Sequence, residues 1–529
     1  MSLNSFNFIA FIIVLFILYF TIPKKFQFYL IIIANLVFFA SFGILGIPFI
    51  AVTSVISYIC AIIVYKIKLK NKADADEIKD RKERTAFLAG RKKKVTFAAA
   101  IGAVFILGIW LLIKYGAFFV ENIDWLMRTV KHGREIPVPD FFIPIGISYY
   151  SFLAVSYIVD VYRGKYEPER NFLKYFCFIS YFPHMIQGPF DRFGTLSKTL
   201  FEEHSFSFDR FEKGLRRAFW GYIKKIAIAD SAALAVNLIF YSDSPYTGIY
   251  IILGALFYGV QIYADFSGYM DIMCGISEIL GIKIAENFER PYFSTSVEEY
   301  WRRWHITLGA WFKDYLFYPI ATGKTAQNLG KRFRKMGKMR AAKLVPSYLA
   351  LVFVWTATGF WHGANWTFIV WGYCNMIVII LSMELEEVYS KIRGFLRIGK
   401  DNRIWTVFMM ARTFFLVSAF RIIALSDNMN TALAYYKKIV TGFAVSLSSV
   451  SDYIDLFPGM SEMKIFFFLI GTVALIMSDI LTEIGKRDIL LMKNFPIYVK
   501  GLVYLFGIYM IILNISMNGT SSGFLYAEY

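Results

Sequence analysis

Apolar residues occupy most of this chain in uninterrupted stretches that are long enough to cross a lipid bilayer. A spanning helix needs about 20 mainly apolar residues, and positions 1–23 carry no charged side chain. Positions 26–65 are also uncharged, and as one helix they would measure roughly 60 Å, about twice the thickness of the hydrocarbon core. We therefore predict one span within 1–23 and two within 26–65, with a turn near residues 43–48 (GILGIP).

The same pattern continues along the chain, with three interruptions. Segments 139–165, 175–195 and 286–320 mix polar and aromatic residues with Pro and Gly. Irregular backbone at membrane depth is tolerated only where it is buried in protein or lines a wet cavity, so we predict that these segments are re-entrant or interfacial and suggest an internal site. The predicted fold class is an all-α integral membrane protein, a single multi-pass domain over residues 1–529 with about 10–12 transmembrane helices. The later candidate spans are residues 95–113, 211–240, 248–281, 345–361, 364–383, 404–425, 465–480 and 501–518.

Composition and charge support a membrane location and suggest an orientation. Hydrophobic residues make up 57% of the chain, charged residues 18%, and the mean hydropathy is +0.50, so the polar surface of a soluble protein of this size is missing. The net charge is +18, and the basic residues gather between apolar stretches. Residues 66–94 carry 12 basic and 5 acidic side chains, and residues 322–343 carry 8 basic and no acidic ones. The positive-inside rule places both segments in the cytoplasm and, counting back, the N-terminus outside the cell membrane; nucleic acid is not needed as a partner.

The sequence argues against several classes of protein. No GxSxG, Walker-type or CxxC motif is present, which argues against a serine hydrolase, an ATP-driven pump and a thiol oxidoreductase. The four cysteines lie far apart in apolar surroundings, which fits neither a zinc site nor a disulfide framework. We predict that they are packing residues: Cys60, Cys177, Cys274 and Cys374.

His362 is the strongest candidate for chemistry. Residues 344–383 contain no Asp, Glu, Lys or Arg, yet His362 lies near the middle of them. Ionisable residues within a membrane usually face a cavity, and Gly359 and Gly363 would let a substrate or backbone approach closely. The alternative is a neutral imidazole that only packs and bonds a carbonyl group. Because imidazole can take a proton from a hydroxyl near neutral pH, we predict that His362 is a general base.

His305 is the second candidate. Read as a continuous helix, residues 300–314 (YWRRWHITLGAWFKD) place His305 on an aromatic stripe. The alternative is an amphipathic interfacial helix anchored by Trp and Arg. Two histidines without further ligands at suitable spacing make a poor metal site, so no metal is predicted. The stripe consists of Trp301, Trp304, His305, Leu308 and Phe312.

Other ionisable residues are weaker candidates for a functional site. Asp265 and Asp271 interrupt an apolar stretch and could line a cavity or pair with an arginine, for which Arg412 and Arg421 are candidates. The remaining histidines are predicted to be structural: His132, His184 and His204.

Together these segments resemble the membrane-bound O-acyltransferases, and within them the bacterial branch that includes the alginate O-acetylation protein. The resemblance covers roughly residues 140–375, a motif-bearing core that precedes C-terminal helices at about 404–518. A competing branch transfers D-alanine to teichoic acids; it is typically shorter, and the aromatic end of this chain, 524–529 (FLYAEY), resembles the alginate-type branch. The matching blocks are 144–150 (PIGISYY), 160–163 (DVYR), 182–189 (FPHMIQGP), 265–271 (DFSGYMD), 286–292 (ENFERPY), 301–305 (WRRWH) with 314–316 (DYL), and 359–363 (GFWHG).

The resemblance implies a ring of helices around a central funnel, with His305 and His362 near its narrowest part and His362 as the catalytic residue. It implies no cofactor. The donor, acetyl-CoA or a carrier-bound acyl thioester, would approach from the cytoplasm, and the acceptor would be an extracytoplasmic partner protein or polysaccharide. Direct transfer is expected, with His305 positioning the donor or assisting the proton transfer. Residues expected to line the tunnel or bind substrate are Asp265, Trp304, Trp361 and Asn365.

Two readings from other classes stay open at this point. In a transporter or channel, Arg412, Arg421, Asp265 and His362 would line the transport pathway and no acyl product would form. In a scaffold the histidines would only pack, and replacing His362 would harm folding as much as function.

Overall fold

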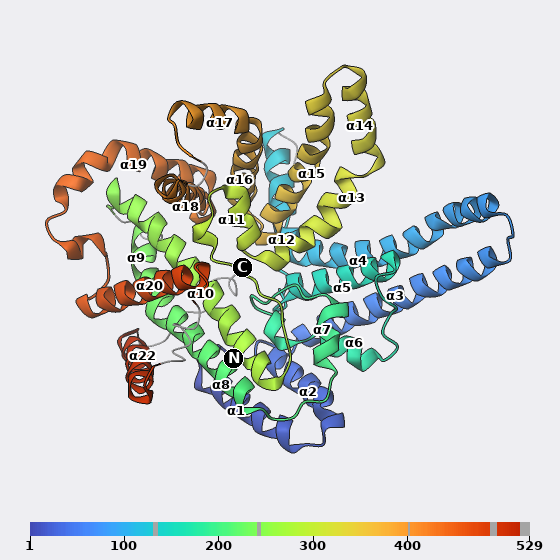
Figure 1. Cartoon of the computed structure of the whole chain (residues 1–529), viewed down its shortest axis with the longest axis horizontal. Coiled ribbons are helices and arrows are strands. Elements are labelled where there is room, and N and C mark those ends of the chain that lie inside the picture. The colour runs from blue at the N-terminus through green and yellow to red at the C-terminus, as the bar shows by residue number, and fades with distance from the viewer. Residues whose placement is uncertain (131–135, 241–244, 400–401, 487–494, 519–529) are drawn as a thin grey trace. The chain divides into compact units, whose positions relative to one another are not determined.

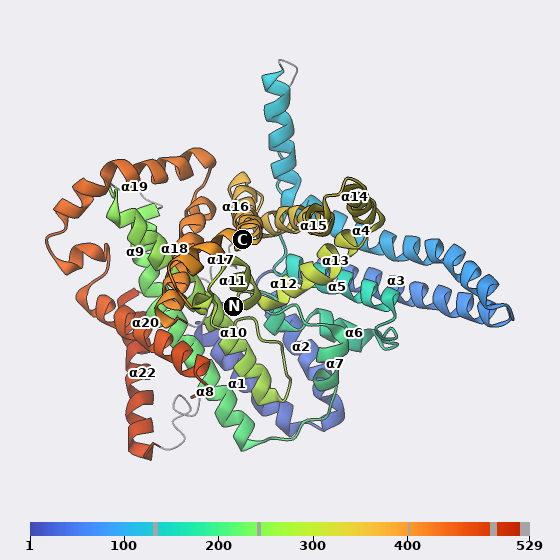
Figure 2. The same cartoon turned by 45° about the horizontal axis from the view of Figure 1, so that its top comes forward.

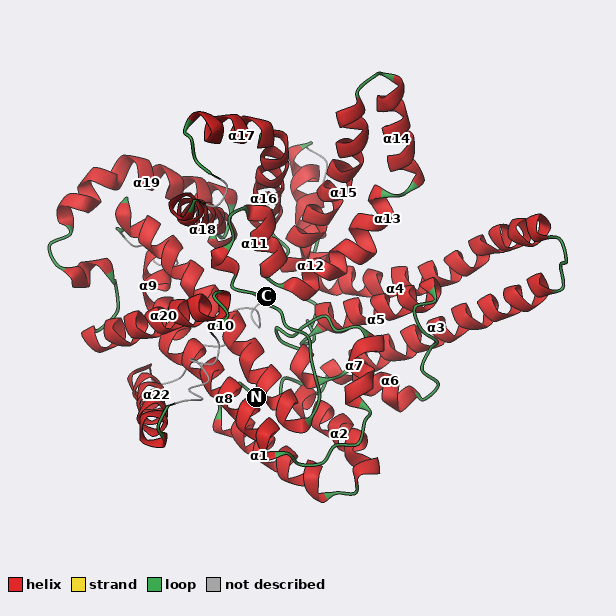
Figure 3. Cartoon of the chain, viewed as in Figure 1, coloured by secondary structure: helices red, strands yellow, loops and turns green. Residues whose placement is uncertain are grey.

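The computed structural model describes residues 1–130, 136–240, 245–399, 402–486 and 495–518. Helices make up 79% of it, and the described residues contain no strand, only an isolated antiparallel bridge between Phe288 and Trp304 (Figure 3). The predicted all-α fold class is therefore confirmed.

The chain is a multi-pass membrane protein. Its described part contains eight helices that are long and apolar enough to cross a membrane, and α1 (Phe6–Thr21) is apolar but shorter. The number of crossings, about 10–12, stays a prediction. The predicted turn is confirmed, because α2 (Gln27–Ala40) ends and α3 begins on either side of Gly43, whose φ of 138° favours glycine. The eight are α3 (Gly46–Asp76), α4 (Arg81–Thr129), α10 (Ile249–Leu280), α15 (Met339–His362), α16 (Trp366–Glu384), α18 (Arg403–Leu425), α20 (Glu462–Glu483) and α22 (Ile497–Asn518).

Contacts divide the chain into two compact units. The first comprises Met1–Leu215 and Met273–Ala285. In it α3 and α4 lie side by side as a long hairpin (Figures 1 and 2), which carries most of the basic segment 66–94 on helix rather than loop. The Asp80 carboxylate begins α4 by accepting from the backbone N–H of Glu83 at 2.8 Å. The remaining helices of this unit are α5 (Ile147–Arg163), α6 (Phe172–Ile179) and α7 (Phe193–Leu200).

The second unit comprises Arg216–Ile272 and Glu286–Tyr529 and contains both candidate histidines. α8 (Phe208–Ile223), which begins in the first unit, leads through a π-helical turn, Lys224–Ala229, into α9 (Asp230–Phe240). The short helices α11 (Val297–Arg303), α12 (Ile306–Phe312) and α13 (Tyr318–Ala321) follow α10. The other helices here, besides the spans already given, are α14 (Lys324–Lys335), α17 (Glu386–Phe395) and α19 (Met429–Ser449).

The π-helical turn supplies counter-ions that the sequence did not reveal. Lys225 Nζ lies 2.8 Å from Asp265 Oδ1 and 2.9 Å from Asp230 Oδ1. Lys224 Nζ lies 2.7 Å from Asp271 Oδ2. Asp271 also pairs with an arginine, as expected, but the partner is Arg217 at 3.0 Å. The suggested pairing with Arg412 or Arg421 is wrong, since lysines one helix away already neutralise both carboxylates.

α15 and α16 pack against each other through their backbones. A Cβ atom on Gly359 would lie 2.8 Å from Ile369 Cα and 2.9 Å from the carbonyl oxygen of Phe368. One on Gly372 would lie 2.9 Å from the carbonyl oxygen of Trp355. Small residues at such a contact let two membrane helices approach closely. This contact fixes the end of α15, and therefore the position of His362.

We expect Gly359→Ala to lower the stability of the protein by about 1–3 kcal/mol, because the added methyl group meets backbone that cannot rotate away. The acyl transfer that the resemblance implies should fall as well, since His362 follows three residues later. Thermal unfolding in detergent measures the first effect. Gly394→Ala is the matched control, because nothing lies within 4 Å of a Cβ atom there; equal melting temperatures for the two variants would contradict the prediction.

Candidate functional site

The helix breaks at Trp304 and His305, so the predicted continuous helix through 300–314 is wrong. Trp304 forms the antiparallel bridge with Phe288, and His305 adopts a left-handed backbone conformation with φ 48° and ψ 51°. Backbone groups that a helix would pair internally are instead paired with residues 287–289. Helical periodicity cannot reveal this partner segment, which is why the sequence analysis missed the break.

Asn287 holds the imidazole ring of His305 in one orientation. The backbone N–H of Thr307 can only donate, and it lies 3.1 Å from Asn287 Oδ1, which also accepts from the Thr307 hydroxyl at 2.8 Å. The same oxygen lies 3.2 Å from His305 Nδ1. His305 Nδ1 therefore carries the proton and donates it, so Nε2 is the basic nitrogen. Burial lowers the pKa of His305 well below its usual value, and nearby His362 adds to this, so the ring is neutral at pH 7.

The structure brings both candidate histidines to one aromatic cluster. Trp361 packs edge-on against both imidazole rings, with centroids 5.5 Å from His305 and 4.9 Å from His362. His362 is the last residue of α15 and also contacts the rings of Trp371, at 5.0 Å, and Phe368, at 6.3 Å. His305 is buried, whereas His362 is half-buried. His362 is therefore the more accessible of the two.

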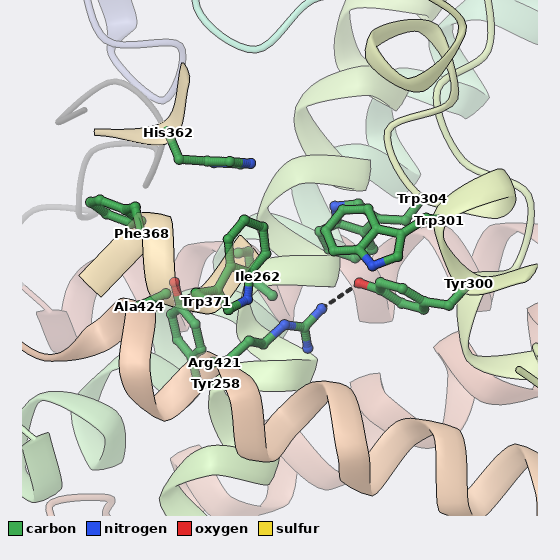
Figure 4. Close-up of a pocket in the computed structure, with 10 residues that line it drawn as sticks. All are labelled: Tyr258, Ile262, Tyr300, Trp301, Trp304, His362, Phe368, Trp371, Arg421 and Ala424. Atoms are coloured by element: carbon green, nitrogen blue, oxygen red, sulfur yellow. Dashed lines mark hydrogen bonds between the residues drawn. The ribbon is translucent and has the colours of Figure 1, made fainter. Parts of the chain in front are cut away.

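His362 projects into an aromatic pocket within the second unit (Figure 4). The cavity is small, with a volume of about 40 Å³. Across this space from His362 lie Trp301 and Trp304, and the Trp301 indole donates to Asn375 Oδ1 of α16 at 3.1 Å. The lining residues are Tyr258, Ile262, Tyr300, Trp301, Trp304, His362, Phe368, Trp371, Arg421 and Ala424.

Arg421 supplies the charge on the pocket wall. Its guanidinium donates to the hydroxyl oxygen of Tyr300 at 2.6 Å and to that of Tyr292 at 3.0 Å. It also lies over the ring of Trp304, 5.1 Å from the centroid. The sequence marked Arg421 only as an isolated charge in an apolar span; its tyrosine partners come from segments that sequence spacing does not connect to α18.

The other predicted site residues lie outside the pocket lining. His305 is one of them, Trp361 contacts both imidazole rings, and Asp265 is held by Lys225. Asn365 begins α16: its Oδ1 accepts from the backbone N–H of Thr367 at 3.0 Å, and its Nδ2 donates to the carbonyl oxygen of Asp427 at 2.7 Å. Its amide group is thus engaged in capping a helix.

Two of the remaining histidines are held by other groups of the protein. His184 is fully buried and its Nε2 lies 3.0 Å from Asp191 Oδ2, while His204 Nε2 lies 2.7 Å from the carbonyl oxygen of Thr199. His132 and the aromatic end 524–529 lie outside the described residues. Within the described ranges no group of three His, Cys, Asp or Glu side chains could hold a metal ion.

Substitutions at His305 separate the role of its left-handed backbone conformation from the role of its imidazole side chain. Asn and Gly tolerate the left-handed conformation, and Ala does not. We expect His305→Asn to unfold at a temperature near that of the wild type and His305→Ala several degrees lower, while both lose at least about tenfold in acyl transfer because both lack the imidazole. If His305→Asn or His305→Gly keeps full transfer, the side chain serves only the turn.

Comparisons with known proteins agree on one family. A family model described as MBOAT, membrane-bound O-acyltransferase family, matches residues 168–425, a range that includes His305, His362 and Arg421. A probable alginate O-acetylase AlgI of Azotobacter vinelandii is 37% identical over 55% of this chain and 55% of its own length. Another, of Pseudomonas fluorescens, is 33% identical over 68% of this chain and 69% of its own. A peptidoglycan O-acetyltransferase of Helicobacter pylori is 27% identical over 64% of this chain and 63% of its own. The chain thus spans little more than half the length of the first of these relatives.

Proposed function

Because the chain belongs to the membrane-bound O-acyltransferase family, we propose that it moves an acyl group, most simply acetyl, from a thioester to a hydroxyl group of an extracytoplasmic glycan or partner protein. The observation that carries the proposal is the half-buried imidazole of His362 in an aromatic pocket, beside a second histidine held neutral. The printed names of the relatives, an alginate O-acetylase and a peptidoglycan O-acetyltransferase, support acetyl as the group and a glycan as the final acceptor.

In this proposal His362 takes the proton of the acceptor hydroxyl as its oxygen attacks the thioester carbon. The C–S bond then breaks, and the thiolate leaves with the proton that His362 received, so the products are an ester and a thiol. Direct transfer of this kind needs no cofactor. His305 is buried and is not among the residues that line the pocket, so its proposed role is to help position the groups at the site through Trp361, which contacts both imidazole rings. Trp304 and Trp361 shape the space around the two imidazoles.

The donor is proposed to be acetyl-CoA or a carrier-bound acyl thioester that arrives from the cytoplasm. The α3–α4 hairpin and α14 carry the two strongly basic segments, and cytoplasmic basic segments suit an anionic donor. This orientation places the N-terminus outside the cell membrane of a bacterium. The acceptor then reaches the pocket from the opposite side, directly or through a partner acyltransferase.

The deciding experiment reconstitutes the purified protein in liposomes and supplies radiolabelled acetyl-CoA on one side and a polysaccharide extract on the other. Labelled ester formed on the far side supports the proposal. A D-alanyl carrier thioester is supplied in parallel, and ester formed only from that donor would move the assignment to D-alanyl transfer. No ester from either donor, together with flux of a solute across the liposome, would favour the transporter reading.

A further inference from the structure

Arg421 brings a full positive charge into the pocket wall without a carboxylate to balance it. Its side chain is almost completely buried. Its hydrogen bonds go to two neutral hydroxyl groups, those of Tyr292 and Tyr300, and it forms no ion pair with any Asp or Glu among the residues that the structure describes. A buried cation without a counter-ion is costly in a protein and more so in a membrane. The rings of Tyr292, Tyr300 and Trp304, over which the guanidinium lies, offset part of this cost, and the charge that they do not neutralise favours a negative group in the pocket.

Two buried lysines of the same unit, Lys224 and Lys225, show the usual arrangement. Lys225 lies between two carboxylates, those of Asp230 and Asp265, and Lys224 pairs with Asp271. Carboxylates thus neutralise these two lysines directly, whereas Arg421, on the pocket wall, has neutral partners. This contrast sets Arg421 apart from a structural charge.

We propose that Arg421, together with the Tyr300 hydroxyl group, holds the negative charge that forms on the acyl carbonyl oxygen during transfer. The inference rests on the acyl transfer proposed above. The guanidinium donates to the Tyr300 oxygen at 2.6 Å, which withdraws electron density and makes the proton of that hydroxyl a stronger donor. Tyr300, Arg421 and His362 all line the same pocket (Figure 4).

His362, Arg421 and Tyr300 each act at a different point of the proposed reaction. When the acceptor oxygen attacks the thioester carbon, His362 takes the hydroxyl proton and the C=O π electrons move onto the carbonyl oxygen. Arg421 and Tyr300 stabilise that oxygen while it is negative. The electrons return as the C–S bond breaks, and the thiolate takes the proton from His362. Fixed donors of this kind stabilise a transition state because they need no reorganisation when charge appears.

The packing around the guanidinium keeps it in this orientation. The Trp304 ring lies against one side of it, and Gly259 of α10 lies against another, where a Cβ atom would be only 3.1 Å from Arg421 Nη1. A charge fixed on two sides is preorganised for one position in the pocket. Arg421 is therefore placed to act on a reacting atom rather than to follow a mobile ligand.

Steady-state kinetics of Arg421→Gln test the proposal. Removing one such donor is expected to lower kcat about 100-fold while the KM for the donor stays within about threefold. Tyr300→Phe removes a single oxygen atom and should lower kcat about tenfold without disturbing the fold. Arg412→Gln is the matched control, since Arg412 lies on the same helix, donates to the carbonyl oxygen of Thr295 at 2.9 Å and does not line the pocket; its kcat should match the wild type.

A binding experiment gives a readout that does not depend on transfer. Methylphosphonate is a small tetrahedral anion that resembles the charged acetyl intermediate, and dimethyl sulfone is its neutral counterpart. Methylphosphonate should raise the melting temperature of the wild type and Arg412→Gln saturably, and that of Arg421→Gln not at all; dimethyl sulfone should shift none of them.

The two experiments separate this proposal from the function on which it rests. If the wild type transfers acyl groups but folded Arg421→Gln keeps its kcat, loses only in KM, or responds to methylphosphonate like the wild type, the role of Arg421 is overturned and the acyltransferase stands. If the wild type transfers no acyl group from either thioester, the proposed function fails and the acyl-oxyanion role of Arg421 fails with it.

Discussion

Replacing His362 with asparagine should lower acyl transfer by about 10²- to 10⁴-fold, the usual contribution of a positioned general base. Asparagine keeps a planar polar group at the end of α15 but cannot take a proton near neutral pH. The ring is half-buried against Trp371 and Phe368, so the loss of packing should lower the melting temperature only slightly. Single-turnover transfer from labelled acetyl-CoA measures the effect on the chemical step itself.

Two controls keep this result interpretable. His204→Asn makes the same substitution at a histidine that bonds the carbonyl oxygen of Thr199, and it should keep transfer within about threefold. In His362→Gly, added imidazole should restore part of the lost rate if the missing group is a proton acceptor. A folded His362→Asn variant that retains more than about a tenth of wild-type transfer would rule out general-base catalysis by this residue.

Lys225→Met should be the most destabilising change in the buried ion cluster, by about 3–5 kcal/mol. The ammonium group is buried between the carboxylates of Asp265 and Asp230, at 2.8 and 2.9 Å. Methionine fills a similar volume but removes the ammonium group that lies between these two buried carboxylates. Whole-protein stabilities are typically about 5–15 kcal/mol, so the melting temperature in detergent should fall steeply, and much of the protein should fail to accumulate in the membrane.

Comparison variants show whether charge is the cause. Lys213→Met breaks an exposed pair with Asp209, 2.7 Å apart, and should cost no more than about 0.5 kcal/mol. Adding Asp265→Asn and Asp230→Asn to Lys225→Met removes the stranded charges and should recover much of the lost stability. If Lys225→Met melts at the same temperature as Lys213→Met, the cluster does not stabilise the fold.

The sequence predicted those features that depend on local pattern. Uninterrupted apolar runs identified most of the span-length helices and the turn at Gly43, and His362 stood out because its neighbours for 40 positions carry no charge. The predicted span 211–240 is instead interrupted by the π-helical turn Lys224–Ala229, and α1 and α2 have only 16 and 14 residues. The resemblance to the membrane-bound O-acyltransferases added the pairing of His362 with His305, and in the structure both imidazole rings contact Trp361.

Features that depend on a distant segment could not be predicted in this way. The periodicity of 300–314 favours a continuous helix, and only pairing with residues 287–289 explains why it breaks at His305. The sequence offered Arg412 and Arg421 as partners for Asp265 and Asp271, whereas the counter-ions are Lys224, Lys225 and Arg217, which sequence spacing does not connect to these carboxylates. In each case tertiary contact outweighs local preference.

The hydrogen bond between Arg421 and Tyr300 can form only late in the synthesis of the chain. Its two residues are 121 positions apart in the chain, whereas Asn287 and His305 are separated by only 18. A ribosome delivers the chain from its N-terminus, and early segments can fold before later ones exist. The turn that holds His305 can therefore form while α18 has yet to be synthesised. A nascent chain that stalls before Arg421 would place both histidines in the membrane without the cation on the pocket wall. With the role proposed for Arg421, such an incomplete chain would transfer acyl groups slowly.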